Sequence, residues 1–269
     1  RVEGAFLHYG YAWRDKNGKM VRRRHPADAV AAGFSAAAVE VAFGTGPLKA
    51  VENSCISTDH DRCEFQLTPD SSLSAGGLVT LNNVTANAPT GGIEEDRIAA
   101  INTGLRDFLS GVAGDDRGMV DAFGVYVTRH LTNYYNAISY TAVNKVAGRN
   151  KALVPMVEGL LRESGHVCVF NTIGGILYSP EWDALVGRIQ GDLEEVVSSS
   201  CAISRALGFG SWSIKELDTN HLVLQTGSEY ESPYCTAVLN QSNPGTSYFL
   251  QGAALAFMGG LNTNVEDIS

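Results

Sequence analysis

The stretch KAVENSCISTDHDRCEFQL, residues 49–67, carries the most specific pattern in this chain. Apolar and polar residues alternate in two runs, one on either side of a polar turn. Alternation with a period of two is typical of strands that bury one face, so the stretch predicts a β-hairpin. Glu52 and Cys55 precede the turn and Cys63 follows it, so we expect the hairpin to bring a carboxylate and two thiols together.

This set of side chains indicates a metal site. Thiolate sulfur and carboxylate oxygen are both ligands of Zn²⁺, and a structural zinc site takes four ligands in a tetrahedron. The hairpin supplies three, so a fourth has to come from elsewhere. The candidates are nearby acidic residues and histidines: His25, Asp28, Asp59, His60 and Asp61. Two other interpretations stay open, in which the thiols pack as small hydrophobic groups or form a disulfide across the hairpin.

Composition restricts the class of protein. The chain has 269 residues, 44% of them hydrophobic, and a formal net charge of −9. This length supplies enough core for one large domain or two smaller ones. The acidic balance argues against nucleic acid or a membrane surface as a partner, because both attract basic proteins. No apolar run approaches the roughly 18 residues of a membrane helix, which predicts a soluble protein.

The cysteines and the first residue bear on compartment and processing. Five cysteines form an odd set without a repeating spacing, which favours reduced thiols and a cytoplasmic protein over a disulfide framework. They are Cys55, Cys63, Cys168, Cys201 and Cys235. The chain begins with Arg1 rather than Met, as expected of a processed product or of part of a longer protein.

The segments before residue 93 predict two hairpins, a helix and a linker. Residues 4–24 alternate around an Asn-Gly pair, which predicts a hairpin ahead of the metal hairpin. Pro26 opens an alanine-rich segment with Gly33 inside it, which predicts a helix that ends before Gly44. Residues 69–92 are rich in Pro, Gly, Ser and Asn, and this composition is typical of a linker between domains.

Helical spacing dominates the rest of the chain. The segments with this spacing are 93–112, 118–146, 152–165, 182–208 and 246–261. Between them, Gly174 and Gly175 predict a turn, and Ser179 predicts a helix cap. Two β-like runs around Asp218 predict a late hairpin.

The small-residue helix occurs twice. The late segment SYFLQGAALAFMGG resembles the early DAVAAGFSAAAVEVAFG when Gly252 is aligned with Gly33. In this alignment Ser247 takes the place of Asp28. This internal sequence similarity predicts two related modules, of which the second lacks the metal hairpin.

These features resemble the 4-vinyl-reductase, or small hydrocarbon-binding, domain family. Its modules end in a hairpin of the form E-x2-C-x7-C-x-F, which here reads Glu52, Cys55, Cys63 and Phe65. A second signature of the family, an aromatic and glycine opening of a strand pair, is similar to LGFGSW at 207–212. The two matches cover about half of the chain.

The resemblance implies an α+β fold, a twisted antiparallel sheet flanked by helices, related in shape to haem-NO-binding domains and vesicle-tethering subunits. It also implies a homodimer. Within one chain, residues 1–68 are then the end of a first module, 69–92 a linker and 93–269 a second module. Zinc-binding members use an upstream cysteine with this Glu and Cys pair. Asp28 stands at the place of that cysteine and His25 lies one helical turn away. Such a zinc is structural, because four protein ligands leave no position for a substrate.

Two pairs of residues invite a catalytic interpretation. His166 and Cys168 are two apart and would share one face of a strand, although a cysteine between valines is more often part of a core. Glu229 and Glu231 share the same spacing, but nothing near them indicates the geometry of a glycosidase. We therefore assign no catalytic residue.

The predicted function is binding rather than catalysis. Dinucleotide-binding, phosphate-binding and common hydrolase motifs do not occur. We expect a ligand-binding or sensor protein with a structural zinc site, whose second module encloses a small apolar ligand, aromatic or lipid-like. The candidate pocket residues are aromatic or histidine: Tyr126, His130, Tyr134, Phe170, Trp182, Trp212 and Tyr230. Two alternatives stay open, an enzyme or accessory subunit of aromatic or tetrapyrrole metabolism, as the family's reductase name implies, and a dimerisation scaffold.

Overall fold

The structure of the chain is a computed structural model. It describes residues 24–25, 28–58, 60–73, 91–116, 120–127, 132–240 and 247–262. The chain divides into two compact units, residues 1–78 with 114–119 (unit 1) and residues 79–113 with 120–269 (unit 2). The predicted hairpin over 4–24 and most of the predicted linker lie outside the described residues.

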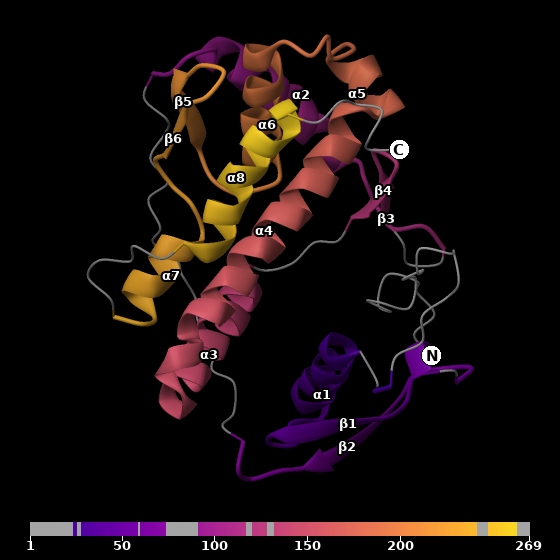
Figure 1. Ribbon diagram of the computed structural model, residues 1–269. Helices are drawn as coiled ribbons and strands as arrows, with labels where there is room; N and C mark the ends of the chain where they lie inside the picture. The colour runs from indigo at the N-terminus through magenta and orange to yellow at the C-terminus, as the bar shows by residue number, and fades with distance from the viewer. Residues whose placement is uncertain are drawn as a thin grey trace. The chain divides into compact units, whose positions relative to one another are not determined.

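Unit 1 contains a helix followed by a hairpin (Figure 1). Helix α1 spans Ala29–Phe43, strand β1 spans Leu48–Ser54 and strand β2 spans Glu64–Pro69. A short 3₁₀ turn, η2, covers Ile56–Thr58 between the strands. The helix ends at Gly44, whose φ of 60° is the left-handed conformation that glycine adopts without steric strain. The helix and the hairpin predicted here are confirmed.

The hairpin packs against α1 through one face only. Burial alternates along β1, and Leu48 at its start is buried. Ala31, Ala32 and Ala36 are the buried residues of α1. Their small side chains let the helix lie close to the strand, so Glu52, which also points inward from β1, is brought close to the start of α1.

Unit 2 is mostly helical. Its elements are α2 (Glu95–Ser110), β3 (Val120–Ala122), β4 (Val125–Val127), α3 (Thr132–Arg149), η3 (Lys151–Leu153), α4 (Val154–Leu177), α5 (Pro180–Leu185), α6 (Leu193–Ala206), β5 (Trp212–Leu217), β6 (Leu222–Thr226), α7 (Glu231–Ala237) and α8 (Tyr248–Asn262). The predicted α+β class is confirmed. In the described part of the chain the strands form three two-stranded antiparallel sheets, β1 with β2, β3 with β4 and β5 with β6.

Helix α6 lies at the centre of unit 2, where residues 196–204 are all buried. Arg205 at its end is fixed by three hydrogen bonds, two to the carboxylate of Glu95 on α2 at 2.7 and 2.9 Å and one to the carbonyl oxygen of Trp212 at 2.7 Å. A bidentate pair of this kind orients both partners. It therefore joins α2, α6 and β5 in one core.

Helix α8 lies side by side with α4 (Figure 1). A Cβ atom added to Gly252 would lie 1.9 Å from the backbone oxygen of Arg162, and one added to Gly165 would lie 2.2 Å from the backbone oxygen of Phe249. The backbones therefore touch, and only glycine fits at either position.

Five predictions about unit 2 are wrong, and three of them concern α4. The helix predicted to end at Gly165 continues to Leu177, because contact with α8 overrides the low helix propensity of glycine. The predicted turn at 174–175 therefore lies inside α4. His166 and Cys168 lie on this helix rather than on a strand, and helical residues two apart do not share a face.

The other two errors are in segments predicted as single helices. Residues 120–127, within the segment 118–146, form the β3–β4 hairpin, and the helix begins only at Thr132. The segment 182–208 is divided into α5 and α6. Gly187 and Gly191 between them have φ values of 106° and 86°, which no α-helix contains. No helix in the described part of the chain has the length and apolar character needed to cross a membrane.

Candidate metal centre

Four side chains meet where the hairpin of unit 1 joins the start of α1. They are Asp28, Glu52, Cys55 and Cys63, and one potential ligand atom from each lies within 4.8 Å of the others. Asp28 and Cys55 are buried, and the other two are half-buried. The three residues predicted from the hairpin are thus brought together, and Asp28 is the fourth member of the cluster.

The hairpin geometry orients Glu52 and Cys55. Glu52 lies opposite Phe65 in the antiparallel register, and the register shifts by one residue between Glu52 and Ser54. Such a bulge changes the direction of the chain next to it. Cys55 directly precedes the η2 turn, and its carbonyl oxygen accepts hydrogen bonds from the backbone N–H of Thr58 and of His60. These bonds fix the position of the first thiol.

The two thiols are neighbours and are not joined by a disulfide. The Sγ atoms of Cys55 and Cys63 lie 3.5 Å apart, and both residues are free cysteines. The Oγ atom of Ser57 lies 2.9 Å from Cys55 Sγ. Because Cys55 is fully buried while Cys63 is half-buried, only Cys63 gives this cluster a thiol near solvent.

The carboxylate of Glu52 is satisfied at one oxygen only. Its Oε2 atom accepts a hydrogen bond of 3.0 Å from the backbone N–H of Asp28. Its Oε1 atom is buried without a hydrogen-bond partner among the described residues. An unpartnered buried polar atom costs about 1–3 kcal/mol. A hydrogen-bond donor or a cation is therefore expected beside Glu52 Oε1.

Asp28 is at the N-cap position of α1, but its side chain makes no capping hydrogen bond to the helix. Aspartate at this position usually accepts a bond from the second or third helical N–H. Here the residue belongs to the cluster instead.

The donor set fits a tetrahedral metal ion. Zn–S bonds are about 2.3 Å long, so two thiolates on one tetrahedral ion lie about 3.8 Å apart. The observed 3.5 Å between the Sγ atoms is close to this value. Two sulfur and two oxygen donors suit zinc, whereas calcium and magnesium take oxygen ligands only.

The remaining metal-ligand candidates lie outside the cluster. His25, His60 and Asp61 are exposed, and Asp59 is outside the described residues. His60 Nδ1 lies 3.1 Å from Thr58 Oγ1. The sequence could not choose between Asp28 and His25, because the choice depends on how α1 begins.

The residues predicted to line a ligand pocket lie in different surroundings. Trp182 and Trp212 are buried in the main core of unit 2, and Phe170 and Tyr230 are half-buried against it. Burial raises the pKa of the Tyr230 phenol above its usual range. Tyr134 contacts the ring of Tyr135, with centroids 5.6 Å apart.

Two of the predicted pocket residues cannot be placed in these surroundings. His130 and the side chain of Tyr126 are outside the part that the structure describes. Tyr230 belongs to a ring cluster with Phe209 and Phe249, at centroid distances of 6.2 and 6.4 Å. Tyr230 therefore forms part of a packed aromatic cluster, whereas Trp182 and Trp212 are part of the core itself.

Glu231 is a buried carboxylate whose structural role the sequence did not indicate. It is 1% exposed and accepts hydrogen bonds from the backbone N–H of Phe249 and Leu250, at 3.3 and 3.1 Å. It sits in the first turn of α7, where acidic residues are common. Nothing in the local sequence therefore marks it as the partner of the distant helix α8.

Comparison with known proteins gives no relative. No family model, no curated protein and no solved structure matches this chain. The resemblance to the hydrocarbon-binding family therefore stays a prediction, and the function has to be argued from the geometry of the cluster.

Proposed function

We propose that Asp28, Glu52, Cys55 and Cys63 bind one Zn²⁺ ion in a structural site that fixes the β1–β2 hairpin to the start of α1. The observation that carries this proposal is the unpartnered buried oxygen of Glu52 beside two thiols 3.5 Å apart. A zinc ion would bind that oxygen and both sulfurs together.

The role is structural because all four ligand positions come from protein side chains. A catalytic zinc site keeps one position for water or substrate. The cluster also joins the start of α1 to the two ends of the hairpin turn. The buried apolar side chains in the described part of unit 1 are few and mostly small, Ala31, Ala32, Ala36, Leu48 and Cys55, so a metal at this point would add stability that their packing alone does not supply.

Elemental analysis of the purified protein tests this proposal. We expect about one zinc per chain in the wild type, and loss of zinc in Cys55→Ser and Cys63→Ser, because thiolates supply the strongest bonds to the ion. Cys168→Ser is the matched control, since Cys168 is an exposed thiol on α4. Zinc retained in Cys55→Ser, or absent from the wild type after growth with added zinc, would contradict the proposal.

The contribution of Asp28 has a separate test. Asp28→Asn keeps the size of the side chain but removes its charge, and it should weaken zinc binding about 10-fold to 100-fold, measured by competition with a coloured chelator. Asp61→Asn is the control, because Asp61 is exposed and outside the cluster. Equal affinities of the two variants would remove Asp28 from the ligand set.

Binding of a small, largely apolar ligand by unit 2 is the second candidate function. It is favoured by two buried polar atoms that lack a hydrogen-bond partner among the described residues, Trp182 Nε1 and Ser199 Oγ. A ligand with a polar group in an apolar frame would satisfy one of them. Titration with phenols, aromatic acids and fatty acids, followed by tryptophan fluorescence, tests this. Absence of binding by all three classes would contradict it.

A further inference from the structure

The two thiols of the cluster occupy facing positions at the end of the β1–β2 hairpin. Ser54 and Glu64 are the paired residues nearest the turn. Cys55 directly follows this pair on one strand, and Cys63 directly precedes it on the other. Facing residues of antiparallel strands have Cα atoms about 4.5–5.5 Å apart, and a disulfide needs about 4.4–6.8 Å. The backbone therefore has the spacing for a disulfide between the two cysteines.

A hydrogen bond beside the cysteines holds the two strand ends together. The Ser54 hydroxyl donates to the carbonyl oxygen of Arg62 at 3.1 Å. This bond joins the residue before Cys55 to the residue before Cys63. The two thiols are thus kept opposite each other whether or not a metal ion is bound to them.

The sulfur atoms are close enough to bond after a small movement. They lie 3.5 Å apart, between the roughly 3.8 Å of two thiolates on one zinc ion and the roughly 2.05 Å of a disulfide bond. Only a thiolate is a metal ligand. The same pair can therefore share a metal ion or bond to each other, but it cannot do both.

The two thiols differ in their access to solvent. Cys55 is fully buried, whereas Cys63 is half-buried. Oxidants react with thiolates that solvent reaches, so Cys63 is the residue that meets an oxidant first. The Ser57 hydroxyl is itself 1% exposed and lies 2.9 Å from the Cys55 sulfur, where it can donate a hydrogen bond to a thiolate. Cys55 is thus placed to react second.

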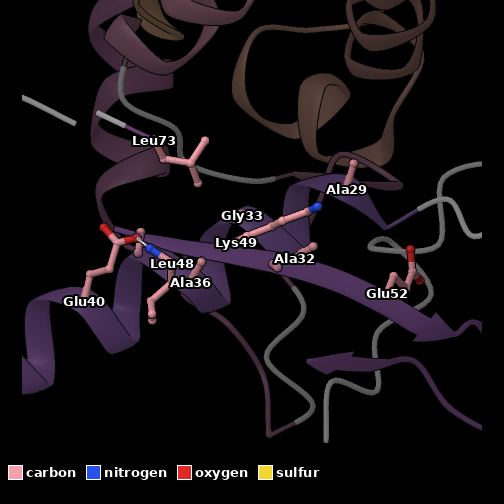
Figure 2. Close-up of a pocket in the computed structure, with 11 residues that line it drawn as sticks. Ala29, Ala32, Gly33, Ala36, Glu40, Leu48, Lys49, Glu52 and Leu73 are labelled. Atoms are coloured by element: carbon pink, nitrogen blue, oxygen red, sulfur yellow. Dashed lines mark hydrogen bonds between the residues drawn. The ribbon is translucent and has the colours of Figure 1, made fainter. Parts of the chain in front are cut away.

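The cluster also borders a hollow between α1 and β1 (Figure 2). The hollow has a volume of about 680 Å³, and Glu52 is one of the residues that line it, with Ala29, Ala32, Gly33 and Lys49. A water molecule takes up about 30 Å³ of the liquid, so the hollow has room for hydrogen peroxide, which is little larger. A small oxidant can therefore approach the Glu52 side of the cluster as well as Cys63.

We propose that Cys55 and Cys63 are a reversible oxidation site, at which hydrogen peroxide converts the zinc-binding thiols into a disulfide and so releases the ion. The release of zinc rests on the zinc site proposed above, whereas the oxidation concerns the thiols alone. The disulfide across the hairpin, which the sequence left open beside the metal site, is then the oxidised form of the same site.

The oxidation takes place in two steps. The Cys63 thiolate attacks one peroxide oxygen, so that an S–O bond forms, the O–O bond breaks and hydroxide leaves a sulfenic acid behind. The Cys55 thiolate then attacks the sulfenic sulfur, so that the S–S bond forms, the S–O bond breaks and a second hydroxide leaves. Two electrons pass from the sulfurs to the peroxide. Solvent supplies two protons, and the peroxide becomes two water molecules.

Oxidation acts on the start of α1, because the disulfide links the strands of the hairpin but not the helix. Once the ion has left, the carboxylates of Asp28 and Glu52 lie within one cluster with no cation between them. Like charges at close range repel each other. We therefore expect oxidation to loosen the start of α1 while it closes the end of the hairpin.

Peptide mapping of the peroxide-treated wild type tests this proposal. Trypsin cleaves after Arg62, which places Cys55 in peptide 50–62 and Cys63 in peptide 63–97. After about two equivalents of hydrogen peroxide and blocking of the remaining thiols, mass spectrometry without reductant should find these peptides joined. A coloured chelator should detect about one released zinc per chain. Dithiothreitol should separate the peptides and restore zinc binding.

Three serine variants test the order of the two steps. In Cys55→Ser the second thiol is missing, so Cys63 should stop at the sulfenic acid, which dimedone traps. In Cys63→Ser the buried Cys55 should be trapped at least about 10-fold more slowly. Cys168→Ser is the matched control, because Cys168 is an exposed thiol on α4, and it should form the same disulfide as the wild type.

Three results would overturn the proposal. The treated wild type could keep its zinc without joined peptides, it could lose zinc through sulfinic acids instead of a disulfide, or Cys63 could be joined to Cys168 as readily as to Cys55. An untreated protein without zinc would contradict the zinc site instead. The joined peptides would then still decide whether Cys55 and Cys63 form an oxidation site.

Discussion

Helices α1 and α8 both begin beside a glutamate carboxylate, but the hydrogen bonds of the two carboxylates and the groups around them differ. Each small-residue helix has a buried glutamate oxygen beside its first backbone N–H groups. At α1, Glu52 accepts one such bond, from Asp28. At α8, Glu231 accepts two, from Phe249 and Leu250. The first carboxylate keeps one oxygen unpartnered, and the second uses both.

The surroundings explain this difference. Beside Glu52 lie two thiols and a second carboxylate. At α8, Ser247 takes the place of Asp28, and its hydroxyl donates to Glu229 at 3.3 Å. A carboxylate at a helix start is therefore an ordinary structural feature, and the added thiols with Asp28 turn it into a candidate metal site.

The largest expected effect is the loss of structure in unit 1 when zinc is removed. Removal of zinc with a chelator should expose backbone amides of residues 29–69 to hydrogen exchange and leave residues 193–206 protected, because only unit 1 contains the cluster. Structural zinc contributes on the order of 10 kcal/mol to the folding of small metal-binding units. Mass-detected exchange of peptic peptides measures both segments at once. Equal loss of protection in the two segments would contradict the comparison.

The next effect concerns the helix packing of α8. Gly252→Ala should lower the free energy of unfolding by about 3 kcal/mol or more, because the added methyl group overlaps the backbone oxygen of Arg162. Denaturant unfolding followed by circular dichroism measures this change. Gly174→Ala on α4 is a control with open space around the glycine, and it should not destabilise the protein.

Titration of Glu231 should change the free energy of unfolding by up to about 3 kcal/mol between low and high pH. Burial raises the pKa of Glu231 from 4.5 to about 7, against the lowering effect of its hydrogen bonds from Leu250 and Phe249, and the nearby Glu229 carboxylate adds to the rise. The folded state thus binds a proton more tightly than the unfolded state. The resulting stabilisation is complete below about pH 4.5 and is lost as the pH rises through 7.

Unfolding of unit 2 at pH 5 and pH 8 measures this linkage. Glu231→Gln stays neutral and should lose most of the difference between the two pH values, whereas Glu163→Gln, at an exposed position of α4, should keep it. An identical pH dependence in all three proteins would show that Glu231 does not titrate in this range.

The smallest effect is at Gly33. Gly33→Ala should stabilise α1 by about 1 kcal/mol, because alanine is the better helix former and the added methyl group meets open space. The measurement is thermal unfolding of unit 1, with the wild type at the same protein concentration. A destabilised variant would mean that this side of α1 is closely packed, as the corresponding side of α8 is.

The sequence predicted those parts of the fold that local patterns define. Alternation and the polar turn predicted the β1–β2 hairpin, and alanine content with a final glycine predicted α1. The prediction failed where glycine served packing. Gly165 suggested the end of α4, but at this position the backbone of α8 approaches so closely that only glycine fits, and the helix continues to Leu177.

By itself, the sequence determined that Glu52, Cys55 and Cys63 would be near one another, because a hairpin joins residues that are close along the chain. Only the tertiary structure selected Asp28 as the fourth member of the cluster, since that depends on where α1 starts relative to β1. Only the tertiary structure brought Glu231 to the start of α8, a helix that begins more than a dozen residues later in the chain. Short-range patterns fix local geometry, whereas contacts between separate elements depend on packing that no local pattern records.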